Sequence, residues 1–225
     1  MGRKNFRITN LKTLVVGCTP LARKVVALLE ELSDLVGLVN LHPEKGVSKS
    51  NYDYMADFVK KRENDVYWTK DINDEKTAEW IKFKNPDLIV QCGWSQIFKS
   101  HILDIPSKYC IGIHPSPLPI GRGAAVLNWK IIESEGAPVN WGNSLFVMEK
   151  KTDTGAVLDC EPFVIEERDD IRTVYQKVDH TALKMLERTV LKISNNEEEL
   201  KVQNNSKATR YFKRTPEDGI IDLSW

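Results

Sequence analysis

Short apolar runs alternate with amphipathic stretches along the first half of the chain. The apolar runs predict buried strands over residues 13–17, 35–41, 66–69 and 87–92. Between them, apolar side chains recur at helical spacing and predict helices over residues 20–32, 52–62 and 75–83. Thr19 and Pro20 are suited to begin the first of these helices. Apolar strands that alternate with helices are typical of a Rossmann-like α/β fold, a mostly parallel sheet with helices on both faces.

The second half of the chain has a different rhythm. Its pattern predicts strands over residues 110–114, 143–148 and 156–165, and helices over residues 124–135 and 171–193. Asp170 is suited to cap the last helix. Residues 194–207 are polar and predict a surface connection. We therefore expect one domain over residues 1–194, followed by a linker and a short C-terminal tail, residues 195–225, that pack on it.

Composition and charge restrict the classes of function. With 225 residues, the chain fits one domain with a short appendage. Its 32 Lys and Arg residues balance 32 Asp and Glu residues, which argues against a general nucleic-acid or membrane binder because phosphate groups attract a cationic surface. The N-terminus has no apolar signal core, and no apolar run reaches the roughly 18 residues of a membrane span. Four cysteines form no CxxC pair and are expected to be small thiols in a reducing cytosol, which predicts a cytoplasmic protein.

Three polar loops follow predicted strands, at the sheet edge where open α/β proteins bind ligands. They cover residues 93–96, 114–123 and 150–155. His114 begins the middle loop, HPSPLPIGRG, whose prolines and glycines fix its path. Such a histidine is either a pre-organised catalytic group or one that only satisfies its neighbours. Asp153, in the sequence TDTG, is either a turn former or the partner that orients an imidazole, and the spacing leaves both pairs of alternatives open.

Four stretches, in order along the chain, resemble the formyltransferase family that uses N10-formyltetrahydrofolate. They are Gly17–Pro20, which resembles the N-terminal turn of methionyl-tRNA formyltransferases, Gly112–Trp129 (GIHPSPLPIGRGAAVLNW), Met148–Leu158 (MEKKTDTGAVL) and Tyr211–Asp222 (YFKRTPEDGIID). By this resemblance the chain is identified as a member of that family. The resemblance implies the formyltransferase fold, N10-formyltetrahydrofolate as co-substrate, and no metal.

The resemblance also implies a catalytic pair and one departure from the family pattern. His114 and Asp153 match the catalytic histidine and aspartate, with the histidine as general base. The catalytic asparagine of the family is Gly112 here, so the amide that would donate to the developing oxyanion is missing. In other enzymes the loss of such a donor costs on the order of 3 kcal/mol. Asn128 and Asn143 could replace it, although a surface or packing role is expected for each.

The remaining site residues are assigned by the same resemblance. The co-substrate is expected against Gly93, Trp94, Ser95, Gln96, Thr152 and Gly155. Trp94 either stacks on a ligand or packs half-buried in the fold. The amine substrate is expected against Ser116, Arg122, Gly123, Asn51 and Tyr52.

The segment from Ser50 to Asn73 is similar to the sugar N-formyltransferases, which act on nucleotide-linked amino sugars destined for surface polysaccharides. A chain that stops at Trp225 and is not basic argues against a tRNA substrate. The partners implied are therefore a small-molecule substrate, no nucleic acid and no membrane, and the enzyme could act as a homodimer. A formylation domain of a peptide synthetase, a non-catalytic relative that binds folate or a nucleotide sugar, and a hydrolase that deformylates the folate stay open as alternatives.

Overall fold

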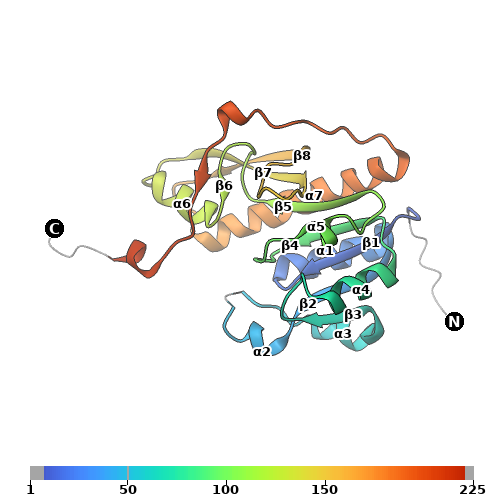
Figure 1. Ribbon diagram of the computed structural model, residues 1–225. Helices are drawn as coiled ribbons and strands as arrows, with labels where there is room; N and C mark the ends of the chain where they lie inside the picture. Colours follow the sequence, from blue (N-terminus) through green and yellow to red (C-terminus); the bar gives the residue numbers. More distant parts are fainter. Residues whose placement is uncertain (1–7, 50, 221–225) are drawn as a thin grey trace.

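A seven-stranded sheet in the order β3-β2-β1-β4-β5-β7-β8 runs through the molecule (Figure 1). The computed structural model describes residues 8–49 and 51–220. Five neighbouring strands are parallel: β1 (Lys12–Gly17), β2 (Asp34–Leu41), β3 (Val66–Thr69), β4 (Leu88–Cys92) and β5 (Tyr109–His114). Two longer strands, β7 (Val139–Val147) and β8 (Val157–Ile165), continue the sheet in antiparallel pairing. The predicted mostly parallel α/β sheet is confirmed.

Helices cover both faces of the sheet, as the apolar strands predict. On one face, Val15 and Leu38 pack with α1 (Pro20–Leu32) and α7 (Ile171–Asn195). On the other face, Leu14 and Val16 pack with α4 (Glu75–Lys84) and α5 (Ser100–Leu103). The shorter helices are α2 (Pro43–Gly46), α3 (Ala56–Lys61) and α6 (Val126–Glu133), with 3-10 turns η1 (Glu63–Asp65), η2 (Asn205–Lys207) and η3 (Pro216–Gly219).

Side-chain caps fix where the two long helices begin. Thr19 Oγ1 accepts a hydrogen bond from the Ala22 amide, and Pro20 occupies the first helical position of α1. Asp170 accepts from the amides of Arg172 and Thr173 at the start of α7. Both caps were predicted from the sequence, because Thr and Asp satisfy amides that have no partner within the helix.

Two predicted helices begin too early. The helix predicted over residues 52–62 begins only at Ala56, because Met55 has a left-handed backbone with φ of 54°. Asp53 holds that turn, since its carboxylate accepts from the Met55 amide and from the Arg23 guanidinium. The helix predicted from residue 124 begins at Val126, because Ala125 has φ of 54°.

The segment after α7 is more than a surface connection. Figure 1 shows the chain turning at the end of α7, running back along the molecule and descending beside β6 (Arg122–Gly123) and α6. There β9 (Arg210–Tyr211) pairs in parallel with β6. We call residues 201–212 the C-terminal strap. The prediction of a polar surface connection over residues 194–207 is wrong at Gln203, which is only 7% exposed. The rest of the tail motif, residues 221 and 222, lies outside the described residues, as does Ser50.

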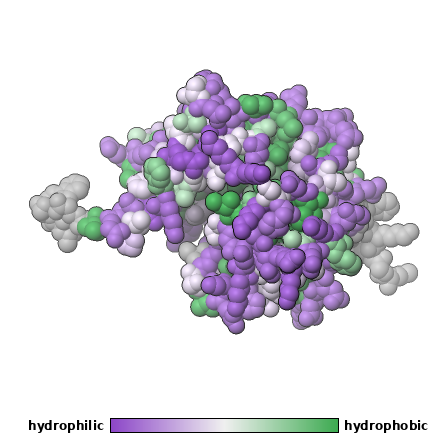
Figure 2. Space-filling view, in the orientation of Figure 1, coloured by the Kyte–Doolittle hydropathy of each residue, from purple (hydrophilic) through white to green (hydrophobic). Residues whose placement is uncertain are grey.

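The hydrophilic surface and the unpaired cysteines agree with what the sequence predicts for them. Figure 2 shows hydrophilic side chains over most of the visible face, with small hydrophobic areas between them. Cys18, Cys92 and Cys110 are buried and free, and Cys160 is free and exposed. Burial raises the pKa of each buried thiol above its usual value, so these groups stay protonated. Within residues 8–49 and 51–220, no helix is long and apolar enough to cross a membrane.

Candidate active site

His114 lies at the carboxyl end of β5 and is buried, with 7% of its surface exposed. Its Nε2 is 2.8 Å from the carbonyl oxygen of Gly121. Because a carbonyl only accepts hydrogen bonds, Nε2 carries the proton and donates it. Nδ1 is then the free acceptor of the neutral ring, and it faces Oδ1 of Asp153 at 3.9 Å.

Asp153 reaches His114 from a strand that runs the other way. The loop of residues 150–155 follows β7, which is antiparallel to β5, so the expectation that it leaves the sheet at the same edge as the His114 loop is wrong. The loop is close because it folds back tightly: a Cβ on Gly155 would lie 1.8 Å from the Val147 carbonyl oxygen, so only glycine fits there. Asp153 has φ of 60°, and its Oδ2 accepts from the Gly123 amide at 2.8 Å. Both carboxylate oxygens therefore have fixed directions.

The position of the family's asparagine is filled by a ring. Gly112 and His114 lie on the same face of β5, because side chains alternate along a strand. A Cβ on Gly112 would lie 2.9 Å from Cε1 of Phe146, its partner on β7. The same ring lies 6.4 Å from the imidazole of His114, nearly perpendicular to it at 82°. The space beside Gly112 is therefore occupied by the Phe146 ring.

Asn143, one of the two proposed substitutes, does not take the place of the missing amide. Asn143 precedes Ser144, which pairs with His114, so its side chain points to the opposite face of the sheet. There its Nδ2 donates to the Val178 carbonyl and to Thr181 Oγ1 on α7. Asn128 lies half-buried on α6. The packing role expected for Asn143 is confirmed.

The loop of residues 93–96, expected to hold the co-substrate, divides into packed and exposed members. Trp94 is 7% exposed within the apolar core on the α4 side of the sheet, and its Nε1 donates to Gln96 Oε1. The Gln96 amide in turn binds the backbone of Ile72 and Lys70. Trp94 and Gln96 therefore fasten the loop, and the packing alternative for Trp94 is the one the contacts support. Gly93 and Ser95 are exposed and can meet a ligand.

Three residues expected to bind the amine substrate are used within the fold. Ser116 is fully buried, and its hydroxyl finds no hydrogen-bond partner among the residues that the structure describes. Arg122 is 6% exposed, and its guanidinium donates to the side-chain oxygens of Gln203 and Asn205. The Gly123 amide donates to the Asp153 carboxylate. These three residues belong to the loop of residues 114–123.

The other two expected substrate residues lie after β2. Asn51 is exposed, with φ of 63°. Tyr52 is half-buried, its hydroxyl donates to the Leu41 carbonyl at 2.9 Å, and burial raises its pKa to about 12. Nearby, the rings of Tyr54 and Trp68 stack at 4.8 Å beside a cavity of about 400 Å³. Thr152, expected near the co-substrate, is exposed, and its carbonyl accepts from Arg210.

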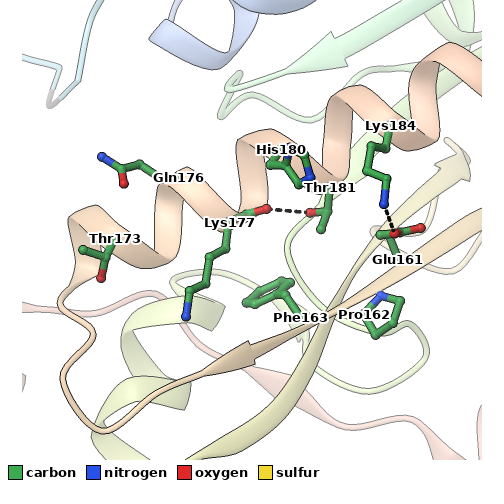
Figure 3. A pocket seen from close by; sticks show the side chains of 9 residues that line it. All are labelled: Glu161, Pro162, Phe163, Thr173, Gln176, Lys177, His180, Thr181 and Lys184. Carbon is green, nitrogen blue, oxygen red and sulfur yellow. Dashed lines mark hydrogen bonds and ion pairs between the residues drawn. The ribbon is translucent and has the colours of Figure 1, made fainter.

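A second cavity lies on the α7 side of β8 (Figure 3). It measures about 410 Å³ and lies between Glu161–Phe163 and the helix segment 173–184. Figure 3 shows Lys184 directed at Glu161, with which it forms an ion pair at 2.8 Å. Thr181 lines this cavity and binds Asn143, so the cavity opens on the face of the sheet away from His114. Neither His114 nor Asp153 lines either of these two cavities.

Two residues that shape the site had no signal in the sequence. Phe146 occupies an ordinary apolar position of a predicted strand, and nothing in its neighbourhood points to Gly112. Gln203 lies in a polar stretch, 50 residues from Asp153 and 81 from Arg122, both of which it binds. Contacts at such separations follow from the tertiary fold and leave no local pattern.

The sequence model of a protein family described as formyl transferase matches residues 24–190, a stretch that contains His114 and Asp153. The chain belongs to the formyl transferase family. Among curated proteins, the bifunctional polymyxin resistance protein ArnA of Wigglesworthia glossinidia brevipalpis is 31% identical over 157 residues, which is 70% of this chain and 24% of that protein. A methionyl-tRNA formyltransferase of Caldanaerobacter subterraneus is 33% identical over 150 residues, 67% of this chain and 48% of that protein. The chain thus spans about half or less of the length of these relatives.

Solved structures share the fold of this formyl transferase chain at lower identity. An N-formyltransferase from Helicobacter canadensis, solved with folinic acid and dTDP-3-aminofucose, has a TM-score of 0.70 at 17% identity, over 90% of this chain and 71% of that one. WlaRD, described as a sugar 3N-formyl transferase, was solved with dTDP and 5-N-formyl-THF; it has a TM-score of 0.69 at 19% identity, over 95% and 72% of the two chains. HypX from Aquifex aeolicus with tetrahydrofolic acid has a TM-score of 0.68 at 17% identity, over 95% and 32%.

Proposed function

We propose that this chain transfers a formyl group from N10-formyltetrahydrofolate to the primary amine of a nucleotide-linked amino sugar, in the cytoplasm. The observation that carries the proposal is the buried pair of His114 and Asp153, 3.9 Å apart, in a chain of the formyl transferase family. The nucleotide-sugar part is supported by the resemblance of residues 50–73 and by two neighbours in fold that are described as sugar-modifying or bound to a dTDP-sugar.

The geometry of the pair suits a primary amine. Nδ1 of the neutral ring and Oδ1 of Asp153 are both acceptors, and their separation of 3.9 Å is too long for a hydrogen bond between them. An amine placed beside them can donate one N–H to each. This arrangement aims the nitrogen lone pair away from the pair and toward the formyl carbon, which favours attack through positioning.

His114 then moves one proton twice. As the new C–N bond forms, the electron pair of the formyl C=O moves to oxygen, and Nδ1 takes the proton that the amine loses. Asp153 stabilises the resulting imidazolium. The electron pair on oxygen then re-forms the C=O bond as the bond from carbon to N10 breaks, and Nδ1 gives its proton to N10, so the products are a formamide and tetrahydrofolate. Phe146 leaves no room for a side-chain donor at residue 112, so the imidazolium carries more of the stabilisation of the oxyanion.

Of the site residues assigned by resemblance, we propose that the exposed ones contact the folate co-substrate and the amine substrate. Gly93, Ser95 and Thr152 would contact the co-substrate, with Gly155 shaping the turn. Asn51 and the exposed part of Tyr52 would contact the amine substrate. We further propose residues 1–194 as the catalytic domain, residues 195–225 as linker and tail, a reaction that uses no metal, and a homodimer as the working assembly.

A second candidate is a non-catalytic relative that binds folate or a nucleotide sugar. One observation favours it, namely that the Phe146 ring occupies the volume of the family's catalytic amide. A formyltransferase acting on an aminoacyl or peptide-synthetase substrate is an alternative within the same chemistry.

The test is a turnover assay with N10-formyltetrahydrofolate and a panel of UDP-, dTDP- and GDP-linked amino sugars. Formamide product is detected by mass spectrometry and tetrahydrofolate by absorbance. The N-acetylated sugars serve as matched controls because they lack the attacking amine. Formamide with one member of the panel supports the proposal. Folate binding by calorimetry with no product from any amine supports the non-catalytic candidate. Release of formate without an amine indicates a hydrolase. Methionyl-tRNA is assayed in parallel, and a formylated product with it identifies another amine as the substrate.

A further inference from the structure

Gln203 is buried and makes four side-chain hydrogen bonds, in a part of the C-terminal strap whose other residues are exposed. Its Nε2 donates to the carbonyl oxygens of Asp153 at 3.0 Å and Gly155 at 2.7 Å. Its Oε1 accepts from Nε and Nη2 of Arg122 at 3.1 and 2.7 Å. Both hydrogens and both lone pairs of the amide are therefore used. Its strap neighbours Val202, Asn204 and Asn205 are exposed.

The four hydrogen bonds join the two loops that make the catalytic pair. Asp153 and Gly155 belong to the turn that carries the carboxylate, and Arg122 precedes Gly123, whose amide binds Oδ2 of that carboxylate. The left-handed backbone of Asp153 is uncommon for a residue with a Cβ and persists only where its surroundings hold it. Gln203 donates a hydrogen bond to the backbone carbonyl of Asp153 itself.

We infer that Gln203 is a positioning residue for the reaction: it fixes the Asp153 turn against the Arg122–Gly123 segment and so sets the direction of the Asp153 carboxylate toward His114. The inference rests on the proposed function. Gln203 itself acts through Asp153 and does not contact the reacting atoms. Its side chain is almost inaccessible, and all four of its partners lie in the protein.

Gln203→Met removes all four hydrogen bonds at nearly constant volume. We expect kcat to fall on the order of 10- to 100-fold, because a misplacement of about 1 Å at a reacting pair has effects of that size. KM for the folate should change less than about 2-fold. Gln203→Glu separates the two sides of the hub, since it keeps the acceptors for Arg122 and loses the donors to the Asp153 turn. It should lose turnover like Gln203→Met.

Asn205→Ala is the matched control. Asn205 lies on the same strap and accepts from Nη2 of the same Arg122, and among the described residues no hydrogen bond joins its side chain to the Asp153 turn. We expect its kcat within about 2-fold of the unaltered protein. If Asn205→Ala and Gln203→Met lose turnover equally, the strap acts only by general support of Arg122, and the inference is wrong.

A double-mutant cycle separates positioning from loss of stability. If Gln203 acts through Asp153, Gln203→Met should lower kcat by less than about 2-fold in a protein that already carries Asp153→Asn. A loss in kcat that multiplies fully in the double variant would overturn the inference.

Hydrogen exchange gives a readout that needs no turnover. The Gly123 amide donates to Oδ2 of Asp153, so Gln203→Met should speed its exchange about 10-fold or more, and Asn205→Ala should not. Unchanged exchange in Gln203→Met overturns the inference even in an active enzyme. If no amine is formylated, the proposed function fails, while this measurement still decides whether Gln203 holds the turn.

Discussion

Restoring the family's asparagine through Gly112→Asn should lower turnover, because the space beside Gly112 is already filled. An added Cβ would lie 2.9 and 3.1 Å from Cε1 and Cζ of Phe146 and 3.2 Å from Cγ of Met148. Ordinary carbon contacts lie near 3.5–4.0 Å. The amide beyond Cβ would have to displace the ring, and overpacking of this kind costs about 1–3 kcal/mol.

The size of the effect can be worked out for stability and for rate. For a chain of this length, about 1–3 kcal/mol corresponds to a fall in Tm of roughly 2–12 °C. Gly112→Ala introduces the Cβ contacts without the amide, so it measures the steric part alone. Turnover should fall in both variants and more in Gly112→Asn, because displacement of the Phe146 ring disturbs its edge-on contact with His114.

Adding Phe146→Ala makes the test sharper. This change alone removes the ring and should cost about 3–5 kcal/mol of stability. In the double variant the asparagine has room, and its amide can donate to the developing oxyanion, an interaction worth about 10²–10³ in kcat in other enzymes. We expect the double variant to turn over faster than either single variant. Steady-state kinetics and thermal melts decide, and a gain in turnover by Gly112→Asn alone at unchanged Tm would refute the reasoning.

Variants at three further positions test His114, Asp153 and the turn that Asp53 supports. His114→Asn or His114→Ala should lower kcat by about 100-fold or more with an unchanged circular dichroism spectrum, and near-normal kcat would remove His114 from the mechanism. Asp153→Asn should lower kcat strongly with little change in folate affinity by calorimetry; collapse of that affinity would make Asp153 a binding residue. Hydrogen bonds from Arg23 hold the pKa of Asp53 below its usual range, so the stability they add is present at neutral pH and lost as pH falls through that lowered pKa. In urea melts, Asp53→Asn should therefore be less stable than the unaltered protein at pH 7, and this difference in the free energy of unfolding should shrink as the pH falls through the lowered pKa of Asp53. A difference independent of pH would contradict this.

Much of the fold follows from local physics that the sequence displays. Strand β4 is buried on both faces, so its residues are apolar with little alternation, and the helices after Thr19 and Asp170 begin at residues whose side chains cap them. The bends that were missed are tertiary. Met55 takes its left-handed backbone beside Asp53, which Arg23 holds from 30 residues away.

In the candidate site, too, the features set by local sequence were predicted and those set by tertiary contacts were not. The histidine loop and the TDTG turn were found because their residues lie next to one another in sequence and resemble a family signature. The direction of β7 was not predictable, since apolar alternation is the same for both strand directions. The roles of Phe146 and Gln203 were not predictable either, because each depends on a partner brought close by the closed fold.

The exchange of an amide for a ring has a kinetic consequence that separates the two proposed functions. His114 and Asp153, the proposed general base and its partner, lie close together, and the side-chain donor at residue 112 is missing, so under the proposed function turnover should be slow rather than absent. Loss of one donor lowers kcat about 10²–10³-fold, whereas general base catalysis contributes about 10²–10⁴ independently of it. A slow rate that falls further in Asp153→Asn is therefore catalysis by this site. A slow rate that is the same in Asp153→Asn arises elsewhere, and it would leave the chain as a binding protein.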